Sequence, residues 1–545
     1  MRYRNFLTGF CLLGLIACSS KKQGDILIHN ATVYTADSAF TTAQAFVIKD
    51  GKFLAVGSSE SLLNNYTADS VIDLRGQPVY PGFYDPHAHF LGLGQMLDQA
   101  DLVGTSSYDE VIQRLNAFHK RNPTALWLIG RGWDQNDWPD KQFPTKEKLD
   151  AAFPNIPVCL TRVDGHAVVI NSKALRLAGI TRNTKVPGGE VVLTGNEPTG
   201  VLVDNAMGLV RRVIPQPDAQ DKERQLLAAQ QVCLSLGLTT VSDAGLDRRD
   251  IELVERLQKE NKLKIRDYVM ISLGEPNLDY YLKRGPFQTD RLTVRSFKLY
   301  ADGALGSRGA CLRKPYNDRP ETGGFLLLSP NELERALTLL AKSEFQANTH
   351  CIGDSANHLI LDLYGKLLKK SNNRRWRIEH AQVVSPDDFW KFNRYSVIPS
   401  VQPTHATSDM YWAAERVGPV RVKGAYAYKD LLKQNGRIAF GSDFPVEAVN
   451  PLYGFHAAVA RVDAQGFPAG GFQMENAVDR ASALKAMTSW AAFANFEDHL
   501  RGSIEPGKQA DFVVLQQDIM KIPATELRKA TVLQTWVGGE KLFQK

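Results

Sequence analysis

The amino-acid sequence predicts an α/β fold: a (β/α)8 barrel of the TIM type, with an inserted domain after its first strand and a small β-sandwich domain. Through the middle of the chain, short β-branched runs alternate with helical patterns, which is typical of parallel βα units. Residues 91–237 separate the first of these runs from the second, far more than one crossover helix requires. Both ends of the chain are instead rich in β-type segments.

Eight runs are expected to form the barrel strands. From the fourth run onward, their carboxyl ends recur at intervals close to the roughly 30 residues per unit of a barrel of about 250 residues. The runs span residues 81–90, 238–243, 265–271, 294–300, 346–350, 376–380, 397–401 and 438–443.

The long gap after the first strand predicts the inserted domain, over about residues 100–220. It carries strand-like runs of its own at residues 127–129, 157–161 and 190–193. With this insertion, the barrel is expected to occupy residues 79–499.

The two ends of the chain, residues 18–78 and 500–545, are expected to pair into the small β domain. Asp50-Gly51 separates two β-type runs and is a strong hairpin signal. Two independent edge hairpins are the alternative.

Composition excludes several classes of protein. The 545 residues hold 65 Lys+Arg and 59 Asp+Glu, a net charge of +6, and 43% of them are hydrophobic. These values are typical of globular chains rather than disordered or fibrous ones. Because no basic run is present, nucleic-acid binding has no support. A mean hydropathy of −0.25 with one long apolar stretch excludes a polytopic membrane protein.

That apolar stretch lies at the amino terminus. Arg2 and Arg4 precede the mostly apolar residues 6–16, and the run ends at Leu15-Ile16-Ala17-Cys18. This pattern resembles the lipobox of bacterial lipoproteins, with residues 1–17 as signal peptide and Cys18 lipidated. The resemblance implies a protein of the cell envelope, anchored by lipid to a bacterial membrane on its periplasmic or surface side. An ordinary signal peptide with a chance cysteine is the alternative.

The remaining cysteines, Cys159, Cys233, Cys311 and Cys351, are too scattered to indicate a disulfide framework or a cysteine metal site. Their pairing stays open, and so does the oligomeric state, with a homo-oligomer among the alternatives.

The clearest local motif is Asp85-Pro86-His87-Ala88-His89, at the end of the first expected strand. Residues two apart in a strand point the same way, so both imidazoles face the barrel mouth, where they can hold one metal. A lone pair of this kind is common and usually inert. Its context favours metal, because candidate ligands recur at later strand ends, the catalytic face of such barrels.

Each later candidate also has a structural interpretation. His350 and His380 end apolar runs and are alternatively buried core histidines. Lys298 lies in an apolar strand and is alternatively a lysine that reaches solvent or pairs with Asp302. Asp443 is alternatively the N-cap of a following helix.

Taken together, these motifs resemble the metal-dependent amidohydrolase superfamily. The resemblance rests on residues 81–89, 297–303, 349–354, 377–382, 441–445 and 506–515. Residues 130–134, 164–166 and 301–309 resemble more narrowly its family 3 branch, which contains YtcJ-like proteins and N-substituted formamide deformylases. The match covers nearly the whole mature chain.

This resemblance implies a metal centre and a reaction. The implied ligands are His87, His89, Lys298, His350, His380 and Asp443. Lys298 would be carboxylated to bridge two ions, because an ammonium is a donor and cannot ligate whereas a carbamate supplies anionic oxygens. One or two divalent ions, Zn²⁺ given the imidazole-rich set, would activate water for attack on a carbonyl. Asp443 would take the proton and pass it to the leaving nitrogen.

The expected substrate is a small molecule with a non-peptide C–N bond, an N-substituted amide or formamide. Cyclic amides, carbamates, esters and a catalytically silent binding protein are the alternatives, and no Gly-x-Ser-x-Gly motif supports a serine hydrolase. The candidate substrate contacts are His405, His166, Trp133, Asp134 and Arg308, with Arg162, Asp164, Trp138 and Arg313 beside them. Loop packing, hydrophobic anchoring and solvated arginines are their structural interpretations.

Overall fold

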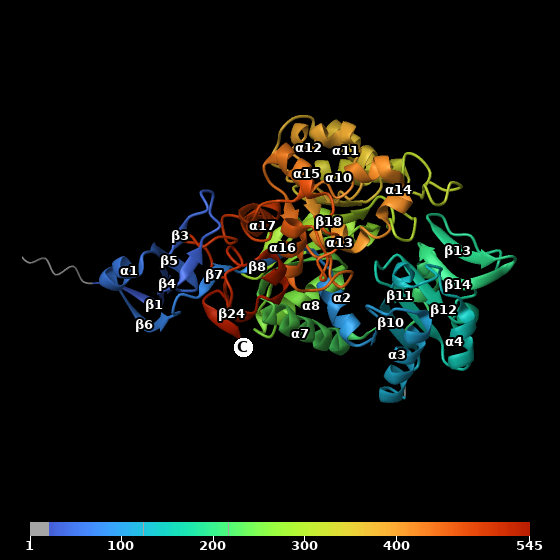
Figure 1. Ribbon diagram of the computed structural model, residues 1–545, viewed down its shortest axis with the longest axis horizontal. Helices are drawn as coiled ribbons and strands as arrows, with labels where there is room; N and C mark the ends of the chain where they lie inside the picture. Colours follow the sequence, from blue (N-terminus) through green and yellow to red (C-terminus); the bar gives the residue numbers. More distant parts are fainter. Residues whose placement is uncertain (1–20, 124, 216) are drawn as a thin grey trace, which may run out of the picture.

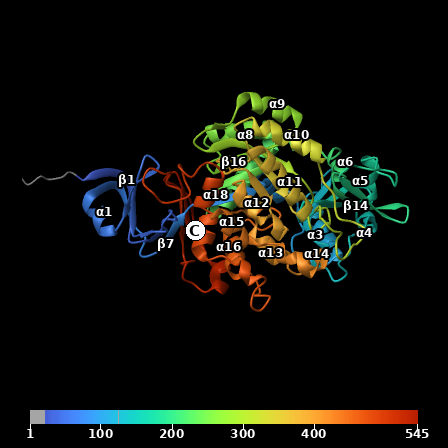
Figure 2. The same ribbon diagram turned by 90° about the horizontal axis from the view of Figure 1, so that it is seen from above.

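The structure is a computed structural model that describes residues 21–123, 125–215 and 217–545. Cys18 and the predicted signal peptide, residues 1–17, lie outside the described residues. Three parts of the fold follow one another along the long axis (Figure 1), and a second view keeps the same order. Figure 2 shows the amino-terminal sheet at one end, the barrel in the middle and an inserted sheet at the other end.

Eight parallel strands form the barrel, which confirms the predicted TIM-type architecture. Neighbours in the sheet follow chain order, as expected when each βα unit crosses over to the next position. The strands are β8 (Phe83–Ala88), β15 (Leu238–Leu246), β16 (Arg266–Ser272), β18 (Leu292–Tyr300), β19 (Gln346–Cys351), β20 (Arg377–His380), β21 (Ile398–Val401) and β22 (Ala439–Phe440).

Helices cover the outside of this barrel and bury apolar faces against it. Two of the longer ones start with a capping box, Asp218 with Asp221 and Ser329 with Glu332, which satisfies their first backbone N–H groups. The helices are α2 (Phe90–Leu97), α7 (Ala219–Ser235), α8 (Arg248–Lys259), α9 (Glu275–Arg284), α10 (Pro330–Ala341), α11 (Asp354–Leu368), α12 (Phe389–Arg394), α13 (Pro403–Asp409), α14 (Ala413–Arg421), α15 (Tyr428–Asn435), α16 (Pro451–Ala460), α17 (Arg480–Ala486) and α18 (Ser489–Ala494).

The eighth strand is shorter than the predicted run 438–443. It ends at Phe440, because Gly441 packs against His87 and the backbone N–H of Ser442 turns to the Asp85 carboxylate, 3.2 Å away. The backbone N–H of Asp443 then donates to the carbonyl of His87 at 2.8 Å. This bond ties the loop after the last strand to the first strand. The first predicted run, 81–90, is likewise shorter, because Pro81 ends β7 (Pro78–Pro81) and His89 stands at the N-cap position of α2.

Between β8 and β15 the chain forms a second sheet of six strands, in the order β13-β14-β12-β11-β10-β9. Its apolar side chains have hydrophobic clusters of their own. The strands are β9 (Ala100–Asp101), β10 (Leu128–Trp133), β11 (Val158–Arg162), β12 (Ala167–Ile170), β13 (Gly189–Thr194) and β14 (Glu197–Asp204), with α3 (Tyr108–Arg121), α4 (Lys146–Ala152), α5 (Ser172–Leu177) and α6 (Met207–Arg211). The bounds of about 100–220 for an inserted domain stay a prediction.

The ends of the chain meet in two further sheets. One has the order β5-β4-β1-β6, and the other, β25-β24-β23-β7-β2-β3, draws strands from both ends. Phe46 and Phe53 of the first sheet pack on Phe512 of the second. The elements are β1 (Lys22–His29), β2 (Thr32–Tyr34), β3 (Thr42–Ala43), β4 (Ala45–Lys49), β5 (Lys52–Gly57), α1 (Ser59–Asn65), β6 (Tyr66–Asp73), β7 (Pro78–Pro81), β23 (Phe512–Leu515), β24 (Val532–Val537) and β25 (Glu540–Gln544). The domain bounds 18–78 and 500–545 stay predictions.

Two further observations concern the described residues as a whole. No helix among them has the length and apolar character needed to cross a membrane. The four cysteines Cys159, Cys233, Cys311 and Cys351 are free thiols in this structure.

Candidate metal centre

His87, His89 and Asp443 bring three metal-binding atoms together at the carboxyl ends of the barrel strands. Nε2 of His89 lies 3.1 Å from Oδ1 of Asp443, and Nε2 of His87 lies 3.5 Å from the same oxygen. The three donor atoms all lie within 4.8 Å of one another. Reciprocal backbone bonds hold this arrangement, since the N–H of His89 also donates to the carbonyl of Phe444 at 2.7 Å.

The protonation states of this cluster fit a divalent cation. Burial, reinforced by the charge of Lys298, lowers the pKa of His87 to about 4, so its imidazole is neutral at pH 7 and offers a lone pair. Burial favours a neutral Asp443, but the neighbouring imidazoles outweigh it and hold its pKa well below the usual range. Oδ1 of Asp443 is buried, and its neighbours among the described residues are the ring nitrogens of His89 and His87. A buried anionic oxygen beside the neutral imidazole of His87 is a site for a cation.

Lys298, His350 and His380 lie beside this cluster. Nζ of Lys298 is 3.0 Å from Nε2 of His87, and Nδ1 of His380 is 4.0 Å from Oδ2 of Asp443. The rings of His350 and His380 have centroids 4.4 Å apart. The structure therefore brings all six sequence-predicted ligands to one place.

Lys298 does not pair with Asp302, the structural alternative for this lysine. Asp302 is occupied by three backbone N–H donors, those of Cys311 and Gly353 at 2.8 Å and of Ile352 at 3.0 Å. Burial lowers the pKa of Lys298 to about 8, so a substantial fraction of this amine is neutral near physiological pH.

A second layer of side chains orients the imidazoles. Nδ1 of His87 contacts Glu379, and Nδ1 of His380 lies 2.8 Å from Oε1 of Gln402. Partners of this kind fix the tautomer, so that the other ring nitrogen faces the metal. Glu379 in turn accepts a 2.5 Å bond from Nε of Arg377. Sequence reasoning missed Glu379, Arg377 and Gln402 as members of this site, although the spacing of Arg377 and Glu379 places both on one face of β20.

Glu379→Gln is expected to weaken metal binding about 10- to 100-fold, because the neutral amide holds His87 less firmly. It is also expected to destabilise the fold by about 3–5 kcal/mol, since Arg377 is left as a buried charge with no carboxylate beside it. Metal titration and urea unfolding measure the two effects. Glu252→Gln, on the exposed face of α8, is the matched control. Unchanged metal affinity would contradict the orienting role.

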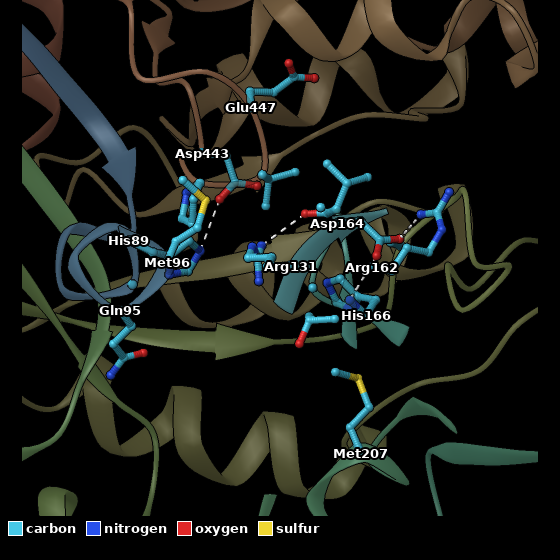
Figure 3. A pocket seen from close by; sticks show the side chains of 18 of the residues that line it. His89, Gln95, Met96, Arg131, Arg162, Asp164, His166, Met207, Asp443 and Glu447 are labelled. Atoms are coloured by element: carbon cyan, nitrogen blue, oxygen red, sulfur yellow. Dashed lines mark hydrogen bonds and ion pairs between the residues drawn. The ribbon is translucent and has the colours of Figure 1, made fainter. Parts of the chain in front are cut away.

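The site faces a large cavity, of about 1560 Å³. The barrel contributes five of the predicted ligands to its wall, and the six-stranded inserted sheet contributes polar groups opposite them (Figure 3). The predicted ligands on the wall are His89, Lys298, His350, His380 and Asp443.

Three of the predicted substrate contacts also line this cavity: His166, Asp134 and His405. The His166 ring lies 5.4 Å from the His350 ring and its Nδ1 lies 2.6 Å from Oδ1 of Asp204. The His405 ring stacks on His380 at 6.0 Å. Asp134 pairs with Arg162. Asp204 had no signal in the sequence, because its pairing with His166 depends on the antiparallel register of β12 and β14.

The structure places Trp133 and Arg308 elsewhere, contrary to the sequence prediction. Trp133 is fully buried in the core of the inserted sheet, where its indole N–H donates to Leu160 at 2.8 Å. Arg308 pairs with Asp318 at 2.9 Å, and neither Arg308 nor Trp133 lines the cavity. The nearby candidates Trp138 and Arg313 are likewise engaged, with Thr105 and Asp388 respectively.

Curated proteins with overall similarity to this chain come from plants and bacteria. Protein LONG AFTER FAR-RED 3 of Arabidopsis thaliana is 33% identical, over 95% of this chain and 91% of its own length. Putative amidohydrolase YtcJ of Bacillus subtilis is 31% identical, over 95% of this chain and 99% of its own. The N-substituted formamide deformylase of Arthrobacter pascens is 27% identical, over 96% of this chain and 98% of its own.

A solved structure gives the same result for the fold. An uncharacterised metal-dependent hydrolase from Pyrococcus horikoshii superposes with a TM-score of 0.74 and 31% identity, covering 92% of this chain and 99% of the other. The model of the Amidohydrolase family, Amidohydro_3, matches residues 70–543. This chain therefore belongs to the amidohydrolase family, as a hydrolase with a site for a divalent metal ion.

Proposed function

We propose that this protein hydrolyses a non-peptide C–N bond in an N-acyl or N-formyl amine, with Zn²⁺ as its cofactor. The observation that carries the proposal is the ionised Asp443 with the neutral imidazoles of His87, His350 and His380 around it, at the wall of a large cavity. The similarity to a protein named as an N-substituted formamide deformylase supports the choice of bond.

His87, His89 and Asp443 would hold one ion, with Lys298, His350 and His380 available to a second. An imidazole-rich set of this kind suits zinc, which lowers the pKa of water and polarises a carbonyl when bound. The protein itself fixes the ligand geometry, through Glu379 behind His87 and Gln402 behind His380.

Asp443 would move the proton in this reaction. Its carboxylate is ionised at neutral pH and can therefore accept a proton from the attacking water. Oδ1 faces the two imidazoles of β8 and its loop, which leaves Oδ2 to take the proton and return it to the departing nitrogen. One carboxylate then serves first as base and later as acid.

Lys298 would react with carbon dioxide to form a carbamate. The neutral amine nitrogen attacks the carbon, an N–C bond forms, and the nitrogen loses a proton. The lowered pKa of Lys298 favours this step, because the protonated amine has no lone pair for attack.

Activation of metal-free protein by carbon dioxide and zinc is expected to speed up as pH rises. With a pKa of about 8, the neutral fraction of Lys298 grows nearly tenfold per unit below pH 8 and levels off above it. Initial activation rates from pH 6.5 to 10, at constant dissolved carbon dioxide, measure this. A rate that keeps rising to pH 10 would show that the amine has an ordinary pKa.

The proposed activity is tested with purified protein loaded with zinc and bicarbonate. We expect stoichiometric metal by elemental analysis and release of free amine from members of a panel of N-acyl and N-formyl amines. The panel also contains cyclic amides, carbamates and esters. Turnover of one of these classes instead would identify a hydrolase of a different bond. Absence of bound metal, or of turnover throughout the panel, would refute the proposal.

We propose further that the protein is held in the cell envelope by a lipid on Cys18. This part of the proposal rests on the sequence of residues 1–18 alone. Metabolic labelling with a fatty acid is expected to mark the wild-type protein and not Cys18→Ser. Equal labelling of both would remove the anchor.

A further inference from the structure

Arg131 is a cationic side chain on the cavity wall, contributed by β10. Its Nη2 donates to the backbone oxygen of Val163 at 3.0 Å, and its Nε is buried without a hydrogen-bond partner among the residues that the structure describes. Within the described part of the chain, no carboxylate oxygen lies within 4.0 Å of the guanidinium. Most N–H groups of the Arg131 guanidinium therefore have no partner among the described residues.

Arg162, on the neighbouring strand β11, is a comparison for Arg131, because its guanidinium is paired within the protein. It forms ion pairs with Asp134 and Asp164, and its Nε donates to Gln135 at 2.8 Å. A charge removed from bulk water normally requires such partners, because desolvation is costly. Arg131 lacks a direct carboxylate partner but is only half-buried on the cavity wall, so a ligand in the cavity can reach its guanidinium.

The guanidinium is nevertheless held in place. The turn after β11 packs against it, and a Cβ built on Gly165 would lie 3.3 Å from Nη2 of Arg131. Gly165 also has a φ of +75°, which favours glycine at this position. Contact with this turn and the bond to Val163 orient the side chain before any ligand arrives, which lowers the entropic cost of binding.

The electrostatics agree with this geometry. Burial lowers the pKa of Arg131 to about 10, against the opposing influence of Asp164 and Asp443, so the side chain remains charged at neutral pH. Asp164 is already paired with Arg162, and Asp443 lies against the imidazoles of His87 and His89. These nearby acids are thus committed to other partners.

Arg131 also stands apart from the candidate metal ligands. Figure 3 shows it projecting into the pocket between Asp443 and His166, with its hydrogen bond to backbone on the Asp164 side. The cavity of about 1560 Å³ is much larger than an amide group alone requires. A substrate whose C–N bond lies at His89 and Asp443 therefore has room to place another group at Arg131.

We propose that Arg131 binds a carboxylate of the substrate, which makes the preferred substrates N-acyl or N-formyl amines that carry a carboxylate elsewhere in the molecule. This inference rests on the proposed function. A guanidinium matches a carboxylate with two parallel hydrogen bonds, a geometry that other cations lack. Asp137, Asp409 and Glu447 line the same cavity, as do the cations Arg211 and Arg162, of which Arg162 already pairs with Asp134 and Asp164.

Matched substrates test this assignment. N-formyl ω-amino acids of two to six carbons are compared with N-formyl alkylamines of the same chain length, using zinc-loaded wild type and Arg131→Met. We expect kcat/KM of the wild type to be at least about tenfold higher for the best acid than for its neutral partner. Arg131→Met is expected to abolish this preference and to leave the neutral substrates within about twofold. Arg335→Met, on the exposed surface of α10, is the control for loss of a positive charge.

Other outcomes overturn the inference. An equal loss of kcat/KM for acids and neutral amides would assign Arg131 to the reacting carbonyl. No loss of kcat/KM for either series would show that Arg131 is solvated by water and binds no substrate group. If the wild type hydrolyses neither series, the wider panel of N-acyl and N-formyl amines decides the proposed function, and calorimetric binding of hexanoate to the zinc-loaded protein decides the carboxylate site separately. Binding at least about tenfold weaker in Arg131→Met supports the site, and equal binding refutes it. Thermal unfolding checks that the variant is folded.

Discussion

Asp443→Asn is expected to lower hydrolysis by about 10³-fold or more while the protein remains folded. The amide that replaces the carboxylate keeps its shape but has no negative charge and cannot accept the proton of the attacking water. Loss of general acid–base catalysis alone costs about 10²- to 10⁴-fold. A weakened metal site adds to this, because Oδ1 of Asp443 is one of three converging donor atoms. Rates are measured at saturating zinc, and bound metal by elemental analysis.

The backbone at this position makes asparagine the appropriate substitution. Asp443 has a φ of 62°, and asparagine adopts this left-handed region more readily than most residues. Asp109→Asn, on the exposed face of α3, is the matched control and is expected to retain full activity. More than a tenth of wild-type activity in Asp443→Asn would contradict the proton-transfer role.

Lys298→Met is expected to remove one equivalent of bound metal and to lower activity by more than about 100-fold. Loss of a side chain that only orients a ligand already costs 10- to 100-fold, and a bridging ligand contributes more. Methionine fills a similar volume and removes a buried amine, whose desolvation is costly. The free energy of unfolding is therefore expected to stay the same or to rise.

Two measurements check this prediction. Elemental analysis counts the ions, and ¹³C-labelled bicarbonate is expected to give a carbamate signal in the wild type that the variant lacks. Two bound ions in both proteins would refute the bridge. One ion in both proteins would assign the site to a single metal and remove the need for the carbamate.

The barrel followed from local sequence patterns, and the set of six ligands followed from the resemblance to the amidohydrolase superfamily. Parallel strands end at one face, so His87, His350 and His380 had to meet once each strand was recognised. Strand bounds were less accurate where tertiary contacts decided them. The eighth strand ends early because the N–H of Ser442 donates to the Asp85 side chain rather than to strand backbone, a contact between residues far apart in the chain.

The cavity wall contributed by the inserted sheet was the hardest part to predict. Trp133 and Arg131 alternate with Gly132 between them, and β-strand alternation alone places them on the same face. In the structure the register of β10 shifts between Arg131 and Trp133, and Gly132 has a φ of +113°. This irregularity sends Trp133 into the hydrophobic core and Arg131 into the cavity. No local sequence signal indicates it.

The pairing of the loop after the last strand with the first strand also constrains how the protein folds. His87 and Asp443 are tied by a backbone hydrogen bond, yet almost the whole barrel lies between them in the chain. Contacts of such high sequence separation form late, because loop-closure entropy opposes them. The donor atoms of the site therefore come together only after the ribosome has synthesised all eight strands. Tight metal binding is then a property of the finished barrel, and a nascent or truncated chain has no competent site for the ion.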